Sequence, residues 1–475
     1  MKHIWRLLAE LLWPQPKKAL KPADALMQLS PDDYWTLRDS QEGTIIFGAT
    51  GSGKTSGSGK TIARKFLQRG MGGLVLTVKV DETKFWTDLA KECGREKDVV
   101  VFGVGKPHRF NFMQYEQERA EEGAGLTQNL SKLFLTVMEM ENKKGGKSQD
   151  DFWANTLKQL LNNTIDLLLL ADLPISVSSM ADIISTAPSN IHEANSPEWA
   201  RNSFCGEALI RAEANMKNPF DYEVTSKYWL IGYPNLAEKT RSIITTQFTA
   251  LADSFMRGTL RELFGTETNI RPEDTWLSNK IIVLSLPTKT FFDIGLKAQV
   301  LFKYAFQLAV ERRDVTLHGS PVFQWADEAQ FFLTSYEPLF LSTARSSRVS
   351  TVYLTQNLPG MLNAAGGESA RNEIEAMLGN LQTKIFHANG DPKTNEFAAN
   401  TVGKTDRFRF NMNWNQQGQG GGSTSEQLDY QLRPIRFTEL SKGGSEHPIV
   451  SAYLFQGGRV WSNKKNYLKV SFKQR

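Results

Sequence analysis

The sequence GTIIFGATGSGKTSGSGKT, residues 43–61, carries a glycine-rich loop between a short apolar run and a helical pattern. Within it, Gly48, Gly53, Lys54 and Thr55 meet the spacing Gly-x-x-x-x-Gly-Lys-Thr. Such a loop surrounds nucleotide phosphates with backbone N–H groups, and the helix that follows directs its positive end at them. We therefore predict one nucleotide-binding site, whose binding residues are Gly48, Thr50, Gly51, Ser52, Gly53, Lys54, Thr55 and Ser56.

The second GSGKT, residues 57–61, repeats only the end of this motif. A second loop would need glycine at position 54, where Lys54 stands. If a helix begins near Gly53, Lys60 lies about 240° around its axis and about 9 Å along it from Lys54, out of reach of the same phosphates. Gly57 and Gly59 each cost a helix up to about 1 kcal/mol relative to alanine, which indicates close approach by another group. That group is either the sheet beneath the helix or a neighbouring subunit or substrate.

Further short runs of β-branched and aromatic residues follow along the chain, at 73–80, 99–102, 280–286, 321–326, 350–356 and 383–388. Such runs are typical of strands buried on both faces of a parallel sheet. Helical patterns, such as those at 61–70 and 298–313, lie between several of them. The sequence therefore predicts an α/β fold with right-handed crossovers.

The hydrophobic pattern changes between Phe102 and Ile281, where long helical patterns replace the strand-like runs. We interpret this part as a mostly helical insertion. The pattern at 4–13 predicts an amphipathic docking helix. Residues 413–427 are rich in glycine and glutamine and predict a loop. The segments VSAYLFQGG and NYLKVSF predict two C-terminal strands. The predicted divisions are an N-terminal segment (1–40), the first half of the nucleotide-binding domain (41–120), the insertion (121–275) and the second half (276–475).

Composition limits the function classes only weakly. A net charge of +5 on 475 residues does not by itself indicate a nucleic-acid partner. Cys93 and Cys205 lie too far apart for a metal knuckle or a disulfide framework, and the six histidines show no metal-ligand spacing. No apolar run reaches the roughly 18 to 20 residues that cross a bilayer, so we predict no transmembrane anchor.

The segment FQWADEAQ, residues 323–330, ends a predicted strand with two carboxylates. A magnesium-dependent nucleotide hydrolase needs one carboxylate near the metal and a base that orients the attacking water. We assign Asp327, with Thr55, to Mg²⁺ and Glu328 to the water, with Lys54 on the phosphates; the alternative for the acidic pair is a surface helix cap. Gln356, at the end of the next strand, is a candidate sensor of the γ-phosphate or simply a strand cap.

Several cations are weaker candidates. Arg345 and Arg348 fit an arginine finger that acts across a subunit boundary, and the alternative is an exposed turn with salt bridges. Arg241 is a third candidate for the same role. The basic loop at 143–147 fits contact with a phosphate backbone, but such a run is more often only solvated.

Four segments together carry a family resemblance: GATGSGKTSGSG (48–59), FQWADEAQ (323–330), STARSSRVSTVYLTQN (342–357) and NLQTKIFHANGDPKTNEF (380–397). They resemble the TraG/TraD group of type IV secretion coupling ATPases, in the HerA/FtsK branch of P-loop motors, over roughly 40–120 and 280–410. The resemblance implies a RecA-like motor domain with an inserted all-helical domain. It also implies a hexameric ring that hydrolyses ATP with Mg²⁺ and threads single- or double-stranded DNA without regard to sequence.

The resemblance further implies a relaxase or secretion-channel proteins as partners. Members that serve secretion channels usually carry N-terminal transmembrane helices, and this sequence shows none. We therefore expect a cytoplasmic protein that partners recruit to the inner membrane, in conjugation, DNA processing or phage defence. The alternative function is a nucleotide-gated assembly or docking ATPase without DNA translocation, and Glu328, as a strong base, favours turnover over a pure switch. A third hypothesis is a phosphotransferase, but the sequence shows no recognisable site for a phosphoryl acceptor.

Overall fold

The computed structural model describes residues 20–119, 122–144, 151–215, 218–414 and 420–474. A nine-stranded sheet forms the centre of the α/β part of the chain, in the order β13-β12-β9-β3-β8-β7-β4-β6-β5. Strands from β9 to β5 in this order run parallel. At one edge β12 pairs antiparallel with β9 and β13 pairs antiparallel with β12, so β13 runs in the direction of β9. The strands are β3 (Thr44–Phe47), β4 (Gly72–Leu76), β5 (Val99–Gly103), β6 (Ile281–Ser285), β7 (Val322–Ala326), β8 (Val349–Thr355), β9 (Thr383–His387), β12 (Ile449–Gln456) and β13 (Tyr467–Lys473).

The predicted α/β fold is confirmed, and burial explains why its strands were readable. Every residue of β3, β4, β7, β8 and β9 is buried, as expected of strands with helices on both faces. The apolar run predicted at 73–80 forms a strand only as far as Leu76, because the chain then turns into α4. The helices of the α/β part are α2 (Leu37–Gln41), α3 (Lys60–Gln68), α4 (Asp81–Glu92), α17 (Thr288–Arg312), α18 (Glu337–Thr343), α19 (Leu358–Ala365), α20 (Arg371–Asn380) and α21 (Pro392–Val402).

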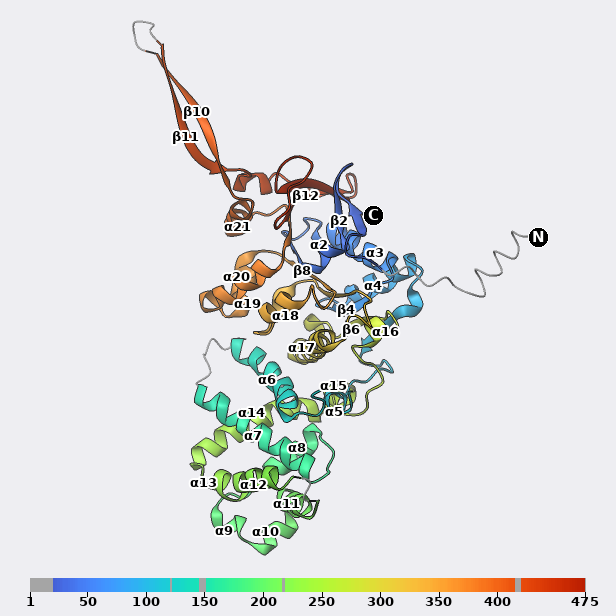
Figure 1. Ribbon diagram of the computed structural model, residues 1–475, viewed down its shortest axis with the longest axis vertical. Helices are drawn as coiled ribbons and strands as arrows, with labels where there is room; N and C mark the ends of the chain where they lie inside the picture. The colour runs from blue at the N-terminus through green and yellow to red at the C-terminus, as the bar shows by residue number, and fades with distance from the viewer. Residues whose placement is uncertain (1–19, 120–121, 145–150, 216–217, 415–419, 475) are drawn as a thin grey trace, which may run out of the picture.

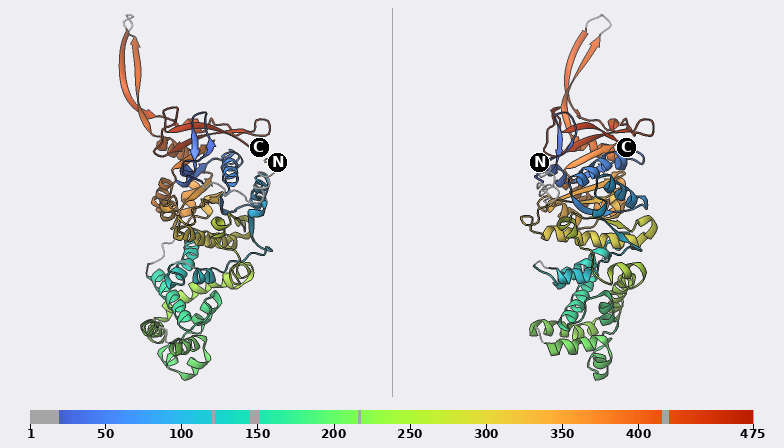
Figure 2. Two further views of the ribbon diagram at one scale, coloured as in Figure 1. Left: turned by 45° about the vertical axis from the view of Figure 1, so that its right-hand side comes forward. Right: turned by 90° about the vertical axis from the view of Figure 1, so that its right-hand side faces the viewer.

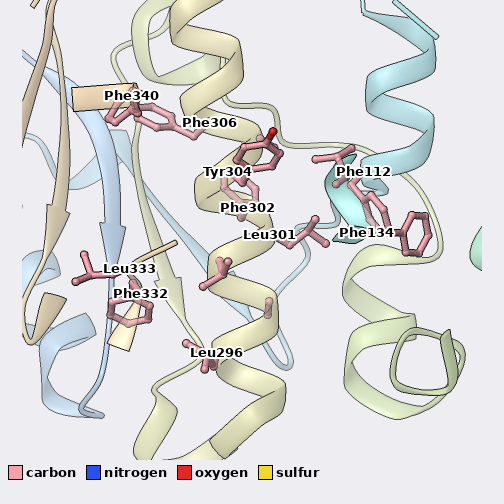
Figure 3. Packing of buried hydrophobic residues seen from close by; sticks show 14 of the residues in the cluster. Phe112, Phe134, Leu296, Leu301, Phe302, Tyr304, Phe306, Phe332, Leu333 and Phe340 are labelled. Atoms are coloured by element: carbon pink, nitrogen blue, oxygen red, sulfur yellow. The ribbon is translucent and has the colours of Figure 1, made fainter. Parts of the chain in front are cut away.

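Two hydrophobic clusters cover the two faces of the sheet. One contains Phe66 of α3 and Trp86 of α4, and the other contains Phe302 of α17. Helix α17 lies between the sheet and the helical part, so its aromatic side chains contact both. Figure 3 shows Phe112 and Phe134 on one side of α17 and Phe332, Leu333 and Phe340 on the other.

Between β5 and β6 the chain is helical and forms a separate body below the sheet (Figures 1 and 2). Its helices are α5 (Phe112–Glu118), α6 (Thr127–Lys144), α7 (Asp151–Leu170), α8 (Val177–Ser185), α9 (Ile191–Ala194), α10 (Pro197–Asn202), α11 (Phe204–Asn215), α12 (Pro219–Lys227), α13 (Tyr233–Asn235), α14 (Glu238–Met256), α15 (Gly258–Phe264) and α16 (Asp274–Leu277). No helix in the described ranges combines the length and the apolar character that a membrane crossing requires. The helix predicted at 4–13 lies outside the described residues.

A long hairpin projects from the end of the molecule opposite the helical body (Figure 1). Its strands are β10 (Lys404–Trp414) and β11 (Gly420–Tyr430), paired in continuous antiparallel register. The loop predicted at 413–427 is therefore wrong at 413–414 and from residue 420 onward, and 415–419 lie outside the described residues. The glycines there have weak strand preference alone, but the ladder with β10 satisfies their backbone groups. A smaller sheet pairs β1 (Ala25–Gln28) with β2 (Tyr34–Thr36).

Candidate nucleotide-binding site

The loop at 48–53 lies where the carboxyl ends of three neighbouring strands meet. It follows β3, and its first amides are anchored to the strands on both sides: Gly48 N donates to Thr355 O (3.2 Å) and Ala49 N donates to Ala388 O (3.0 Å). Gly51 and Gly53 have φ of 73° and 82°, a left-handed conformation that favours glycine. A Cβ on Gly48 would overlap with Ser52 Oγ. The glycine spacing therefore reflects what this turn requires sterically.

The predicted catalytic groups converge on this loop. Lys54 Nζ donates to Glu328 Oε1 at 3.1 Å, and Thr55 Oγ1 donates to Asp327 Oδ2 at 2.8 Å. Gln356 Nε2 donates to the same Glu328 oxygen at 3.2 Å. Because β7 and β8 are neighbours, the residues that follow them reach the end of β3 together. The structure thus brings the five predicted site residues together, and two of the three contacts join residues more than 270 positions apart.

Glu328 is held in an unusual environment. It is 4% exposed and has a φ of 51°, which is a strained backbone conformation for a residue with a side chain. Burial by itself raises its pKa, but the Lys54 ammonium and hydrogen bonds from Gln330 and Gln356 outweigh burial and hold the pKa below its usual value. Glu328 is therefore an ionised carboxylate in this arrangement, as a base that orients water must be.

A cavity of about 690 Å³ opens over the loop. This size lies in the range of small-molecule and cofactor sites. Its lining includes residues 49–56 together with Lys79, Lys289 and Gln356. Ser52 Oγ is buried without a hydrogen-bond partner among the described residues. The left-handed glycines, the lysines and this unsatisfied hydroxyl fit a polyphosphate, and the Thr55 hydroxyl with the Asp327 carboxylate supplies the hard oxygen donors that Mg²⁺ prefers.

The second glycine pair has a packing role. Lys54–Gly59 form a π-helical turn before α3 begins, instead of the α-helix expected from Gly53. A Cβ on Gly57 would overlap with Cγ2 of Val450, and one on Gly59 would lie 3.2 Å from Leu354 Cδ2. The packing alternative is confirmed, because strands of the sheet are what approach these glycines. Lys60 lines the outer part of the same cavity, and its Nζ lies 3.9 Å from Glu92 Oε1.

Two residues near the site were missed by sequence reasoning, the half-buried Glu82 and the fully buried His387. Glu82 Oε2 accepts from Val78 N at 2.7 Å, and burial together with the nearby Asp327 carboxylate raises its pKa to about 8. His387 Nε2 and Ser58 Oγ lie 2.7 Å apart beneath the loop, and burial lowers the pKa of His387 to about 4. His387 is the last residue of β9, which was its only sequence signal, whereas Glu82 lies in the first turn of α4 and had none.

The two arginine-finger candidates lie at the amino ends of the parallel strands, whereas the nucleotide cavity lies at their carboxyl ends. Arg345 and Arg348 precede β8, whereas Gln356 follows it, and seven strand residues span roughly 23 Å. Arg345 is 60% exposed in its side chain and pairs with Glu42 at 3.2 Å, while Arg348 donates to Gly319 O at 2.6 Å. Neither reaches the cavity of its own chain, so a role in a neighbouring chain stays a prediction. Arg241 donates to the carbonyls of Pro234 and Leu236 near the start of α14.

The structure describes two of the three lysines of the predicted basic loop. Lys147 lies outside the described residues, and Lys143 and Lys144 end α6.

Residues 321–440 match the family described as the TraM recognition site of TraD and TraG. This match covers about a quarter of the chain and includes β7 with its acidic pair and the hairpin β10–β11. The resemblance to TraG/TraD coupling proteins is thereby confirmed over these residues. No curated protein matches the sequence.

Solved structures of a bacterial conjugative coupling protein share the fold of the whole chain. The unbound form of TrwBdeltaN70 aligns with a TM-score of 0.60 at 14% identity, covering 98% of this chain and 92% of that one. TrwB with a non-hydrolysable ATP analogue gives 0.59 at 14% identity (98% and 92% covered), and TrwB with ADP and Mg²⁺ gives 0.59 at 13% identity (97% and 95%). The fold expected from the resemblance, a RecA-like α/β domain with an inserted helical part, is confirmed.

Proposed function

We propose that the chain is an ATP-hydrolysing motor of the TraG/TraD coupling type that moves DNA through a hexameric ring. The observation that carries this proposal is the contact of Lys54, Glu328 and Gln356 above a glycine-rich loop, with Thr55 and Asp327 paired beside it. Loop, metal donors, base and sensor are the parts that such hydrolysis requires. TrwB, which shares the fold, has been solved with an ATP analogue and with ADP and Mg²⁺.

Each residue then has a separate role in hydrolysis. The loop amides and Lys54 hold the phosphates; Lys54 has three N–H donors and can keep Glu328 while it binds a phosphate oxygen. Thr55 and Asp327 would hold Mg²⁺, which neutralises charge on the phosphates. Glu328 orients the attacking water, and Gln356 links that carboxylate to the end of β8. Arg345 or Arg348 of a neighbouring chain completes the site in the ring.

The family match also supports a second candidate, a docking ATPase whose turnover a protein partner controls. The matched region is described as a TraM recognition site in TraD and TraG, and relaxosome proteins are the partners this suggests. In this alternative, hydrolysis switches the protein between docked and released states without moving DNA.

The ATPase rate with and without DNA separates the two candidates. For a motor, single- or double-stranded DNA raises the rate, the effect grows with DNA length, and it weakens steeply with salt because phosphate contacts release counterions. The Glu328→Gln protein, which keeps the size of the side chain but not its charge, serves as the blank for contaminating activity. Native mass measurement in parallel must show the ring. A rate that ignores DNA in an assembled ring would favour the docking ATPase.

A further inference from the structure

Gln474 lies just beyond β13, where the C-terminal strands meet the nucleotide cavity. Its backbone N donates to Pro448 O at 2.9 Å, and its side chain lines the cavity. Nε2 donates to Ser56 Oγ at 3.1 Å, and Oε1 accepts from Gly444 N at 2.9 Å. The carboxamide therefore joins the phosphate-binding loop to the loop before β12.

The orientation of this carboxamide is fixed by its neighbours. Gly444 N can only donate, so the oxygen of Gln474 must face it, and the nitrogen then faces the Ser56 hydroxyl. Gly443 has a φ of 71°, and a Cβ there would overlap with Oε1 of Gln474. This pair of glycines thus allows the side chain to be held against the loop.

The order of the strands shows which part of a nucleotide lies next to Gln474. Asp327 and Glu328 follow β7, which lies beyond β8 on one side of β3, whereas β13 lies beyond β9 and β12 on the other side. In the proposed hydrolysis the terminal phosphates would face the two carboxylates, because Glu328 orients the attacking water and Asp327 serves Mg²⁺. Ser56 follows Thr55 at the start of the helical turn, so the nucleoside end of the ligand lies on the side of β13.

Gln474 retains the hydrogen-bonding groups that a base needs. A carboxamide has two N–H donors and two acceptor lone pairs. Among the described residues, Ser56 and Gly444 use one of each, which leaves one N–H donor on Nε2 and one acceptor lone pair on Oε1. This pair complements N6–H and N7 of adenine. We propose that Gln474 binds the base of the nucleotide and selects adenine over guanine, an inference that rests on the proposed nucleotide hydrolysis.

The test compares three ligands in the presence of Mg²⁺: ATP, GTP and inorganic tripolyphosphate, which has no base. Their dissociation constants are measured for the full chain and for Gln474→Ala, with Lys473→Ala as the control at the exposed neighbouring position. We expect Gln474→Ala to weaken ATP about tenfold and to leave tripolyphosphate within twofold, and Lys473→Ala to change neither. Equal losses of ATP and tripolyphosphate, or no loss of either, would overturn the inference, because Gln474 would then only support the loop or do nothing.

A second variant gives an independent check. Gln474→Glu keeps acceptors for Gly444 N and the Ser56 hydroxyl but has no donor, and two acceptors suit the N1–H and N2–H groups of guanine. Its added charge weakens both triphosphates alike, so the ratio of the two constants is the readout, and we expect it to move at least tenfold toward GTP. An unchanged ratio overturns the inference. If the unmodified chain binds no ATP, the proposed function itself is contradicted. If ATP binding depends on Lys54 but not on Gln474, only the inference about Gln474 is contradicted.

Discussion

Among single residues, Lys54 and Lys60 provide the sharpest contrast, because both line one cavity and occur in the same local sequence. Lys54 is buried at the loop and contacts Glu328, whereas Lys60 lies near Glu92 on the outer side of α3. We expect Lys54→Ala to abolish ATP binding or turnover, and Lys60→Ala to weaken binding less than threefold. Calorimetric titration with a non-hydrolysable ATP analogue gives both affinities and a stoichiometry near one. Equal losses in the two variants would show that the repeat has two functional copies.

Glu82 makes stability depend on pH in a defined direction. Its carboxyl stays protonated in the folded chain up to a pKa of about 8, because burial and Asp327 oppose its charge, whereas the ordinary value is 4.5. Between these pH values the unfolded chain loses a proton that the folded chain keeps. The contribution is therefore fully present below pH 4.5 and is lost as the pH rises to about 8, by at most about 1.4 kcal/mol per pH unit.

Glu82→Gln removes this titration but keeps the shape of the side chain. Relative to the unmodified chain, its free energy of unfolding should rise progressively between pH 5 and pH 8 in metal-free buffer. Urea unfolding at several pH values measures the difference. A difference that stays constant over this range contradicts a protonated Glu82.

At the scale of elements, the contact between the π-helical turn Lys54–Gly59 and β12 predicts that substitutions at Gly57 and Val450 have non-additive effects on stability. Gly57→Ala places a methyl group against Val450 and should destabilise the chain by roughly 1 to 3 kcal/mol. Val450→Ala opens space for this methyl group. The double variant should therefore lose about 1 kcal/mol less unfolding free energy than the two single losses added together. Gly379→Ala in α20 is the control, since a Cβ there meets nothing within 4 Å. Strict additivity at positions 57 and 450 would exclude the contact.

Elements differed in how far the sequence predicted them. Central strands such as β3 and β8 were predictable because burial on both faces forces a continuous apolar run. Strand β11 was not, because Gly420–Gly422 and the serines around Thr424 are typical of loops, and only their pairing with β10 makes them a strand. Local composition cannot show a ladder whose partner decides the structure.

At the scale of the whole molecule, the position of Arg345 and Arg348 far from their own cavity makes a prediction about assembly. If either arginine acts across a subunit boundary, mixing its alanine variant with the Lys54→Ala protein restores part of the ATPase activity. Some interfaces in a mixed ring then join an intact loop to an intact arginine. Native mass measurement must confirm that mixed rings form. Mixed rings without recovered activity, for both arginine variants, would count against this role.

The candidate site was predictable where its residues follow motifs at strand ends, and not where the fold alone joins them. Gly48 to Thr55, Asp327, Glu328 and Gln356 were found because their spacing relates to buried strands. Glu82, His387 and Gln474 have no such spacing. His387 and Gln474 contact the turn that follows the loop, and Glu82 lies within the electrostatic influence of Asp327, only because helices and strands distant in sequence fold together.

The order of the sheet has a consequence for biosynthesis. Strand β3 lies between β8 and β9, whose residues leave the ribosome about 300 positions later, roughly 15 to 60 s at ordinary elongation rates. Throughout that interval an apolar strand and the loop after it have neither neighbour. The nascent chain must therefore keep β3 from pairing elsewhere, and chaperone protection of the nascent N-terminal part should matter more for the yield of this protein than the stability of the finished fold.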